Sequence, residues 1–247
     1  MPSPTHILFI GNSFTQRNDL PLMLATLAAS ARPARHLETR RVIANGMPLK
    51  AHWTRGAALE QIRRPPLDYV VLQEQSTLPL KNRARMHESV RTFDEAIRAA
   101  GAKTVLYMTW ARLHEFERQD ELADAFLSIG RDVNATVVPA GLAWQSALRE
   151  DPSLVLHDKD GSHPNPLGTY LAACVFYAKL FGKSPEGLSH DLPVVAKEDE
   201  TRIRSLQQVA WRTVNSVADE KLTPSPGTPG EGRGEGHSRK ERTRPSP

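Results

Sequence analysis

The chain has 247 residues, of which 39% are hydrophobic and 24% are charged, and its formal net charge at pH 7 is +4. This composition supports one sizeable hydrophobic core and excludes a chain that is disordered throughout. The strongly apolar runs are far shorter than the roughly 20 residues of a membrane-spanning helix, and the nearly balanced charge argues against nucleic acid or a membrane surface as a partner.

Five short apolar segments have the length of β-strands, and longer segments with the apolar period of a helix lie between them. The predicted strands are 5–10, 37–44, 67–73, 103–109 and 135–139. The predicted helices are 20–31, 53–63, 85–100, 116–134, 142–149, 166–181 and 197–220. Because strands alternate with helices, we expect an α/β fold of flavodoxin-like type, a three-layer α/β/α sandwich around a five-stranded parallel sheet.

Residues 1–222 are expected to form this single domain, and residues 223–247 a disordered tail. The tail is rich in Pro and Gly and has no aliphatic or aromatic side chain, so burial cannot offset the entropy lost on ordering it. A basic docking segment at 239–244 is the alternative interpretation of the tail. The single cysteine, Cys174, cannot form an internal disulfide, and the N-terminus lacks the pattern of a signal peptide. The sequence as written therefore predicts a cytoplasmic protein.

Parallel sheets bind ligands at the carboxyl ends of their strands, so the residues that follow each predicted strand are candidate site residues. Ser13 follows the first strand, and Gly11 before it permits a tight turn. A serine hydroxyl becomes an effective nucleophile only with a neutral base within hydrogen-bond reach and a third group that orients the base. Without such partners, Asn12 or Ser13 would only turn the chain or cap the next helix.

The segment Asp160-Gly161-Ser162-His163 precedes the predicted helix 166–181 and offers candidates for both partners. If Gly161 permits a sharp turn, the carboxylate of Asp160 can reach Nδ1 of His163 and leave Nε2 free as a base. The alternative interpretation is an Asp-Gly turn with a helix-capping group. Considered alone, this segment does not decide between the two.

Acyl transfer also needs hydrogen-bond donors for the oxyanion that forms on the substrate. Gly46 follows the second predicted strand and could present its backbone N–H to a substrate oxygen. Gln75 follows the third strand and could present its side-chain amide, with Gln73 as a possible substitute. These residues become an oxyanion hole only if the fold brings them to one edge of the sheet.

Four further residues at strand ends are considered as substrate contacts. Asn12 and Trp110 are candidate substrate-binding residues, although a tryptophan in such a place more often packs in the core. Glu74 and Arg112 are either substrate contacts or solvated charges.

The motifs as a set resemble those of the SGNH, or GDSL-type, serine hydrolases. Gly-Asn-Ser-Phe at 11–14 stands where that superfamily has Gly-Asp-Ser-Leu, and Asp160-Gly-Ser-His163 matches its closing Asp-x-x-His block. The resemblance covers about residues 5–182. It implies Ser13 as the nucleophile, His163 as the base and Asp160 as its partner. The oxyanion hole implied by the resemblance comprises the backbone of Ser13, Gly46 and Gln75.

Two positions depart from the superfamily pattern. Asn12 replaces an Asp that is not a member of the triad, and Gln75 replaces an Asn and is one methylene longer. The third strand ends in Leu-Gln-Glu-Gln-Ser, which looks most like a poorly characterised branch of the superfamily. The sequence lacks Gly-x-Ser-x-Gly, which argues against the larger α/β-hydrolase fold.

The resemblance implies a serine esterase that needs no cofactor and acts on short-chain acyl or acetylated carbohydrate esters. The alternative is a flavodoxin-like, non-catalytic module that binds a nucleotide or small ligand, although no Gly-rich phosphate loop is present. Metal-dependent hydrolysis through His157, Asp158, Asp160 and His163 is a third interpretation. The substrate, the choice between hydrolysis and acyl transfer, and the oligomeric state are left open.

Overall fold

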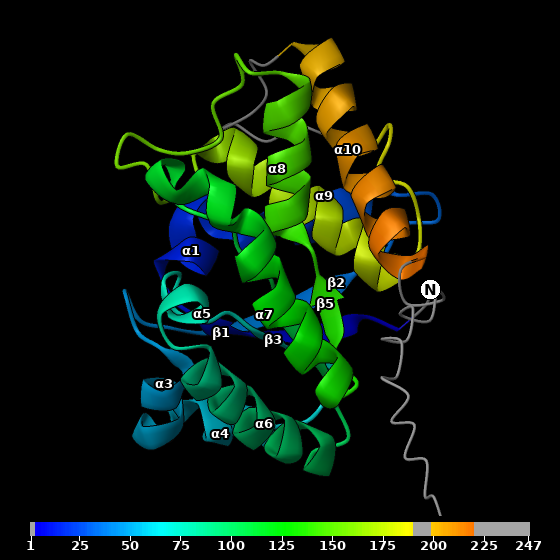
Figure 1. Cartoon of the computed structure of the whole chain (residues 1–247). Helices are drawn as coiled ribbons and strands as arrows, with labels where there is room; N and C mark the ends of the chain where they lie inside the picture. Colours follow the sequence, from blue (N-terminus) through cyan, green and yellow to red (C-terminus); the bar gives the residue numbers. More distant parts are fainter. Residues whose placement is uncertain (1–2, 190–198, 220–247) are drawn as a thin grey trace, which may run out of the picture.

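The computed structural model describes residues 3–189 and 199–219 (Figure 1). The predicted tail at 223–247 and both ends of the last predicted helix, 197–198 and 220, lie outside the described residues. Within the described part of the chain, no helix has both the length and the apolar character that crossing a membrane requires.

The core of the fold is one sheet of five parallel strands in the order β2-β1-β3-β4-β5. The strands are β1 (Thr5–Gly11), β2 (Leu37–Ile43), β3 (Tyr69–Leu72), β4 (Lys103–Tyr107) and β5 (Thr136–Val138). All five predicted strands are confirmed, with small differences at their ends. Because β1 lies between β2 and β3, the chain reverses its direction of winding there, and this is where ligands bind in open parallel sheets.

Side chains of the central strands alternate between two apolar clusters. Ile7 and Phe9 of β1 point into one cluster, whereas Leu8 and Ile10 point into the other, and all four are fully buried. Strands buried on both faces are continuously apolar, which is why these segments were recognisable in the sequence.

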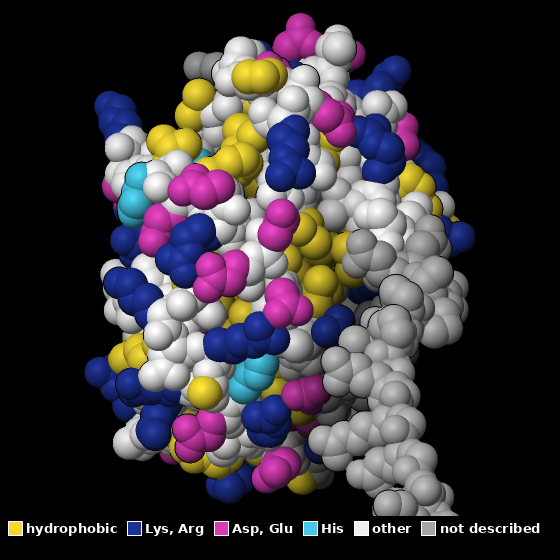
Figure 2. Space-filling model, viewed as in Figure 1, with side chains coloured by type: hydrophobic (Ala, Val, Ile, Leu, Met, Phe, Trp, Pro, Cys, Tyr) yellow, Lys and Arg dark blue, Asp and Glu magenta, His cyan; other side chains and the backbone are white. Residues whose placement is uncertain are grey.

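Helices cover both faces of the sheet, which confirms the three-layer sandwich (Figure 1). One face is covered by α2 (Leu20–Ser30), α8 (Ala140–Glu150), α9 (Pro166–Phe181) and α10 (Glu200–Asp219). The other face is covered by α3 (Leu49–Arg55), α4 (Ala57–Ile62), α6 (Arg83–Ala99) and α7 (Gln119–Asp132). On the side seen in Figure 2, acidic and basic side chains are interspersed.

Helix α9 is buried on all sides, because it packs against α2, α8 and α10 as well as the sheet. Its bounds are those predicted from the sequence. It carries Cys174, which is fully buried, and burial raises the pKa of this thiol to about 12 although a hydrogen bond with Tyr170 opposes the shift. The thiol is therefore protonated at neutral pH.

The predicted helix 53–63 is wrong in two respects. The helical segment begins earlier, at Leu49, and it is divided at Gly56, whose φ of +80° ends α3 and starts α4. A left-handed residue ends an α-helix, and glycine adopts that conformation without steric cost.

Single-turn helices were not predicted either. They are α1 (Ser13–Gln16), α5 (Leu78–Lys81) and two 3₁₀ segments, η1 (Arg17–Asp19) and η2 (Leu113–Arg118). Segments this short have no apolar period to recognise. Three of them, α1, η1 and η2, follow the ends of β1 and β4 and contribute to the site described next.

Candidate active site

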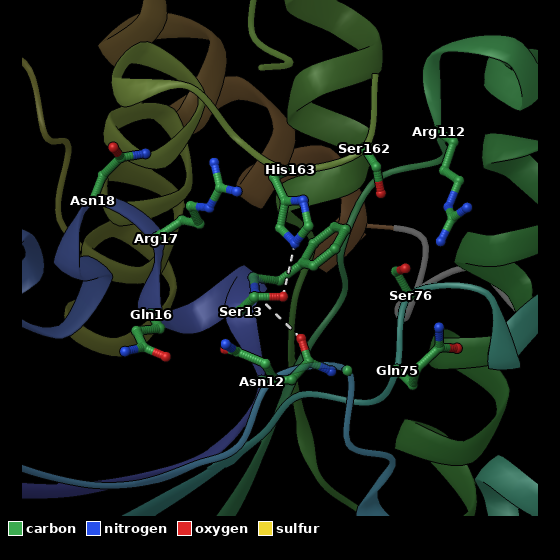
Figure 3. A pocket seen from close by; sticks show the side chains of 13 residues that line it. Asn12, Ser13, Gln16, Arg17, Asn18, Gln75, Ser76, Arg112, Ser162 and His163 are labelled. Atoms are coloured by element: carbon green, nitrogen blue, oxygen red, sulfur yellow. Dashed lines mark hydrogen bonds between the residues drawn. The ribbon is translucent and has the colours of Figure 1, made fainter. Parts of the chain in front are cut away.

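A cleft of about 660 Å³ opens at the carboxyl edge of the sheet (Figure 3). It is lined by residues that follow β1, β2, β3 and β4 and by the loop that precedes α9. Its lining is mostly polar, and Phe14 contributes a large apolar side chain. The expectation that strand-end residues share one edge is met by Asn12, Ser13, Gly46, Gln75 and Arg112, which all line this cleft.

Ser13 is the first residue of α1 and faces the cleft. Asn12 is the N-cap of this helix, because its Oδ1 accepts a hydrogen bond from the N–H of Phe14 at 3.2 Å. The hydroxyl of Ser13 is thus not used for capping, and its Oγ lies 2.8 Å from Nε2 of His163 (Figure 3). Asn12 thus caps the helix, and the Ser13 hydroxyl is left in contact with the imidazole of His163.

His163 is held in a tight loop between α8 and α9. Gly161 turns this loop with a φ of +64°, and the N–H of Asp158 donates to the carbonyl of His163 at 2.8 Å. An isolated antiparallel bridge between His157 and Pro164 closes the loop. These contacts fix the backbone from which the imidazole reaches Ser13.

Asp160 completes the arrangement on the far side of the imidazole. Its Oδ2 lies 2.5 Å from Nδ1 of His163, and its Oδ1 accepts hydrogen bonds from the N–H groups of Ser162 and His163, both at 2.9 Å. Partial burial works against ionisation, but these hydrogen bonds from His163 and Ser162 outweigh it and lower the pKa of Asp160. The carboxylate is therefore ionised at neutral pH and accepts the proton on Nδ1, which leaves Nε2 as the acceptor facing Ser13.

Contacts between η1 and the His163 loop explain how residues 150 positions apart meet. The side-chain amide of Asn18 donates to the carbonyl of Pro164 at 3.0 Å and to Oγ1 of Thr169 at 2.9 Å. Arg17 forms an ion pair with Asp158 at 2.5 Å. The segment that follows Ser13 and the loop that carries His163 are thus held together by direct hydrogen bonds.

The predicted oxyanion donors also lie at the cleft. The N–H of Ser13 opens a helix and so has no acceptor within it. Gly46 lies in the turn after β2 with a φ of +65°, and the next residue, Met47, accepts a hydrogen bond from Nδ2 of Asn12 at 3.2 Å. Both ends of the Asn12 amide therefore bond within the protein. Asn12 lines the cleft, and its side chain fixes the turn beside Gly46.

The structure distinguishes Gln75 from Gln73. Gln73 is fully buried, and its Oε1 accepts hydrogen bonds from the N–H of Asn12 at 2.8 Å and from Oγ1 of Thr15 at 3.1 Å. Gln75 lines the cleft, and its Oε1 accepts from the N–H and Oγ1 of Thr77, both at 3.0 Å. With its oxygen held in this way, Gln75 directs its amide nitrogen into the cleft (Figure 3).

Glu74, considered above as a substrate contact or a solvated charge, is neither. Its side chain is 1% exposed, and its Oε1 accepts hydrogen bonds from the N–H of Leu49 at 3.0 Å and of Gln75 at 2.7 Å. Burial raises the pKa of this carboxyl, although the two hydrogen bonds oppose the shift. Glu74 joins the segment after Gly46 to Gln75, a connection between two strand ends that the sequence alone does not reveal.

Trp110 does not line the cleft, so of its two expected placements the structure shows core packing and not the substrate contact. It is 2% exposed, and its ring stacks on Trp144 with centroids 3.6 Å apart and planes inclined by 4°. Its Nε1 donates to the carbonyl of Ser162 at 3.0 Å. Trp110 is directed into the core because a large partner ring is available there, and from that position it supports the loop that carries His163.

The four side chains considered for a metal each have another partner. Nε2 of His157 bonds to the carbonyl of Ala111 at 3.1 Å, and Asp158 pairs with Arg17. Asp160 and His163 bond to each other. Among the described residues, no group of three or more His, Cys, Asp and Glu side chains is arranged to hold a metal ion.

No protein-family model and no curated protein sequence matches this chain. Solved structures do. A protein from Slackia heliotrinireducens, provisionally assigned as an SGNH hydrolase, superposes with a TM-score of 0.61 and is 29% identical, over 72% of this chain and 100% of that one. This likeness supports assignment of the chain to the SGNH, or GDSL-type, hydrolase superfamily.

Two further solved structures match this chain at lower identity. A DUF4886 family protein from Bacteroides uniformis is 18% identical with a TM-score of 0.69, and the match covers 86% of this chain and 95% of that one. A variant of an acetyl-xylooligosaccharide esterase from Geobacillus is 13% identical with a TM-score of 0.60, over 73% and 97% of the two chains. These two likenesses concern the fold, and the comparisons together support a hydrolase.

Proposed function

We propose that this SGNH-type protein is a serine esterase in which Ser13, His163 and Asp160 form the catalytic triad. The observation that carries the proposal is the unbroken set of contacts from Ser13 Oγ to His163 Nε2 at 2.8 Å and from His163 Nδ1 to Asp160 Oδ2 at 2.5 Å. This is the arrangement that a serine needs to act as a nucleophile: a neutral base in contact with the hydroxyl and a carboxylate that orients the base.

The reaction follows from the protonation states of these groups. Ser13 Oγ attacks the ester carbonyl while Nε2 of His163 takes its proton, and the carbonyl π electrons move to the oxygen. The imidazolium that forms is stabilised by Asp160, which is ionised. His163 then gives its proton to the departing alcohol as the ester bond breaks. Water then attacks the acyl carbonyl while His163 takes its proton, and His163 gives that proton to Ser13 Oγ as the acyl–serine bond breaks and the acid is released.

The oxyanion formed on the substrate is bound by the N–H groups of Ser13 and Gly46 and by the amide of Gln75. Support comes from the position of these three residues on one cleft and from the orientation of the Gln75 amide. Removing one such donor typically lowers kcat by about 10²- to 10³-fold. Glu74 stabilises two of the three, because its carboxyl bonds to the segments that carry Gln75 and Gly46.

The character of the cleft favours short-chain acyl or acetylated carbohydrate esters. Its lining includes asparagine, glutamine, serine and arginine side chains, which suit hydroxyl and carboxyl groups better than a long alkyl chain. The protein of similar fold from Geobacillus is an acetyl-xylooligosaccharide esterase, which agrees with this substrate class.

The experiment that tests the proposal combines turnover of 4-nitrophenyl acetate with covalent labelling by a fluorophosphonate and mapping of the labelled residue by mass spectrometry. We expect the label on Ser13, and we expect Ser13→Ala to lose both label and turnover while circular dichroism shows an intact fold. Ser162→Ala is the matched control, since Ser162 lines the same cleft. Turnover that persists in Ser13→Ala, or a label on another residue, would contradict the proposed role.

A further inference from the structure

Arg112 projects into the cleft from the loop that follows β4, and its charge has no counterpart there. Figure 3 shows its guanidinium directed toward Ser76, on the same side as Gln75 and opposite Arg17. The cleft is lined by two arginines, whereas no Asp or Glu is among its lining residues. Arg17 is paired with Asp158 at 2.5 Å, but Arg112 makes no ion pair with any described carboxylate.

The surroundings of Arg112 make the lack of an ion-pair partner energetically unfavourable. Its Nε is buried and has no hydrogen-bond partner within the described part of the chain. Arg40, which also lacks a carboxylate partner there, instead donates to the carbonyls of Arg64 and Pro66. A partly buried guanidinium without acceptors has lost hydration that no group among residues 3–189 and 199–219 replaces. A bound anion would supply the missing acceptors.

The backbone on both sides of Arg112 is held in place by contacts with α7 and with the loop between α8 and α9. The N–H of Ala111 donates to Oε1 of Gln119 at 2.7 Å, and the carbonyl of Ala111 accepts from Nε2 of His157 at 3.1 Å. The N–H of Leu113 donates to the carbonyl of Gly161 at 2.9 Å. Because Gly161 belongs to the loop that carries His163, the backbone next to Arg112 is hydrogen-bonded to the same loop as the proposed base. The backbone that carries this charged group therefore loses little freedom when a ligand binds.

We propose that Arg112 is the centre of a carboxylate-binding subsite, so that the preferred substrates are esters carrying a carboxylate group. This inference rests on the proposed function, and it specifies the substrate class of the same cleft. The planar guanidinium binds a carboxylate through two parallel hydrogen bonds, and the hydroxyl of Ser76 beside it is a further donor. A single unpaired cation matches a single negative charge, which favours a carboxylate over a phosphate dianion.

The test compares two pairs of esters whose members differ only in charge. The first pair carries the charge on the acyl group: 4-nitrophenyl hydrogen adipate and its terminal amide. The second pair carries it on the alcohol: 3-acetoxybenzoate and 3-acetoxybenzamide. For at least one pair, we expect kcat/KM of the wild-type protein to be higher for the anionic member. The pair that shows this preference identifies which part of the substrate reaches Arg112.

Arg112→Gln should lower this preference for the anionic ester by about tenfold to a hundredfold, because a hydrogen-bonded charge pair is replaced by a neutral contact. Arg112→Lys should retain part of the preference. Arg118→Gln is the matched control, since it removes the same charge from η2, where Arg118 pairs with exposed Glu121 outside the cleft. The preference in this control should equal that of the wild type.

A second measurement uses the unaltered protein and does not depend on the folding of a variant. If the charge of the substrate is on the alcohol side, 3-hydroxybenzoate should inhibit turnover of 4-nitrophenyl acetate at least tenfold more strongly than 3-hydroxybenzamide. If the charge is on the acyl side, adipate should inhibit this turnover more strongly than adipamide. The proposal of a carboxylate-binding subsite is overturned if inhibition is equal within both pairs, or if the preference for the anionic ester is unchanged in Arg112→Gln. In that case hydrolysis of the neutral esters that still depends on Ser13 leaves the proposed function intact, whereas hydrolysis independent of Ser13 overturns the function itself.

Discussion

Asp160 binds His163 at two points, through Oδ2 to the ring Nδ1 at 2.5 Å and through Oδ1 to the backbone N–H at 2.9 Å. The carboxylate therefore orients the imidazole and also shapes the turn that carries it. Only the first of these contacts requires a negative charge that accepts the Nδ1 proton. The two contributions can be separated by substitution.

Asp160→Asn should lower kcat by up to about 10⁴-fold with little change in thermal stability. An asparagine oxygen can still accept from the backbone N–H groups, but its NH₂ group cannot accept the Nδ1 proton, so the imidazole adopts the wrong tautomer. The measurement is kcat for an activated acetyl ester alongside Tm. Asp132→Asn on α7 serves as the control, because it removes an exposed ion pair with Arg91 that lies outside the cleft. A kcat for Asp160→Asn within a few-fold of wild type would remove Asp160 from the triad.

The pH dependence of kcat/KM should show one protonation on the acidic side. Protonated His163 cannot take the proton of Ser13, so the rate falls as the pH is lowered. Asp160 does not add a second step in this range, because its pKa is lowered from the ordinary 3.8 and its carboxylate stays ionised. A pH–rate profile with a neutral ester therefore has a limiting slope of one. A slope of two above about pH 4, or a flat profile with chemistry limiting, would contradict this assignment.

Glu74→Gln should gain stability relative to wild type as the pH rises from 4 to 8. The pKa of Glu74 is raised above 4.5 in the folded protein by burial, so above pH 4.5 the folded state binds more protons than the unfolded state. The free energy of unfolding of the wild type then falls with rising pH until the pH passes the folded-state pKa, and the variant lacks this contribution. Urea denaturation across the range measures the difference.

Glu88→Gln on α6 is the control for this experiment, because it makes the same substitution at an exposed position. If the difference between Glu74→Gln and wild type shrinks as the pH rises, Glu74 is not the buried, proton-retaining carboxyl that its surroundings indicate.

Trp110→Phe should lower both stability and kcat. The substitution keeps an aromatic ring against Trp144 but removes the hydrogen bond to the carbonyl of Ser162, at a cost of about 1 kcal/mol for this partly buried contact. Because Ser162 precedes His163, we also expect a decrease in kcat of several-fold. Trp53→Phe, which alters a ring contact with Phe93 on the other face of the sheet, should leave kcat unchanged. A wild-type kcat in Trp110→Phe would show that the loop is held by its other contacts alone.

The sequence by itself determined the strands, most of the helices and the candidates for the triad. Continuous apolar runs identify strands buried on both faces, and helix 166–181 is marked by its apolar composition and by Pro166 at its start. Ser13, Asp160 and His163 were recognisable because each belongs to a short local motif in a fixed order. Such features are properties of neighbouring residues in one segment, so they can be read without knowing the other segments.

The tertiary structure decided which strand-end side chains face the cleft and which support it from behind. Trp110 and Glu74 look like cleft residues in the sequence, yet Trp144 gives one an aromatic partner and Leu49 gives the other a hydrogen bond within the interior. The choice of Gln75 over Gln73 and the unpaired charge of Arg112 likewise depend on neighbours from other elements. The physical reason is that burial, pairing and orientation of a polar side chain are set by contacts between distant segments, and these exist only after the sheet has assembled.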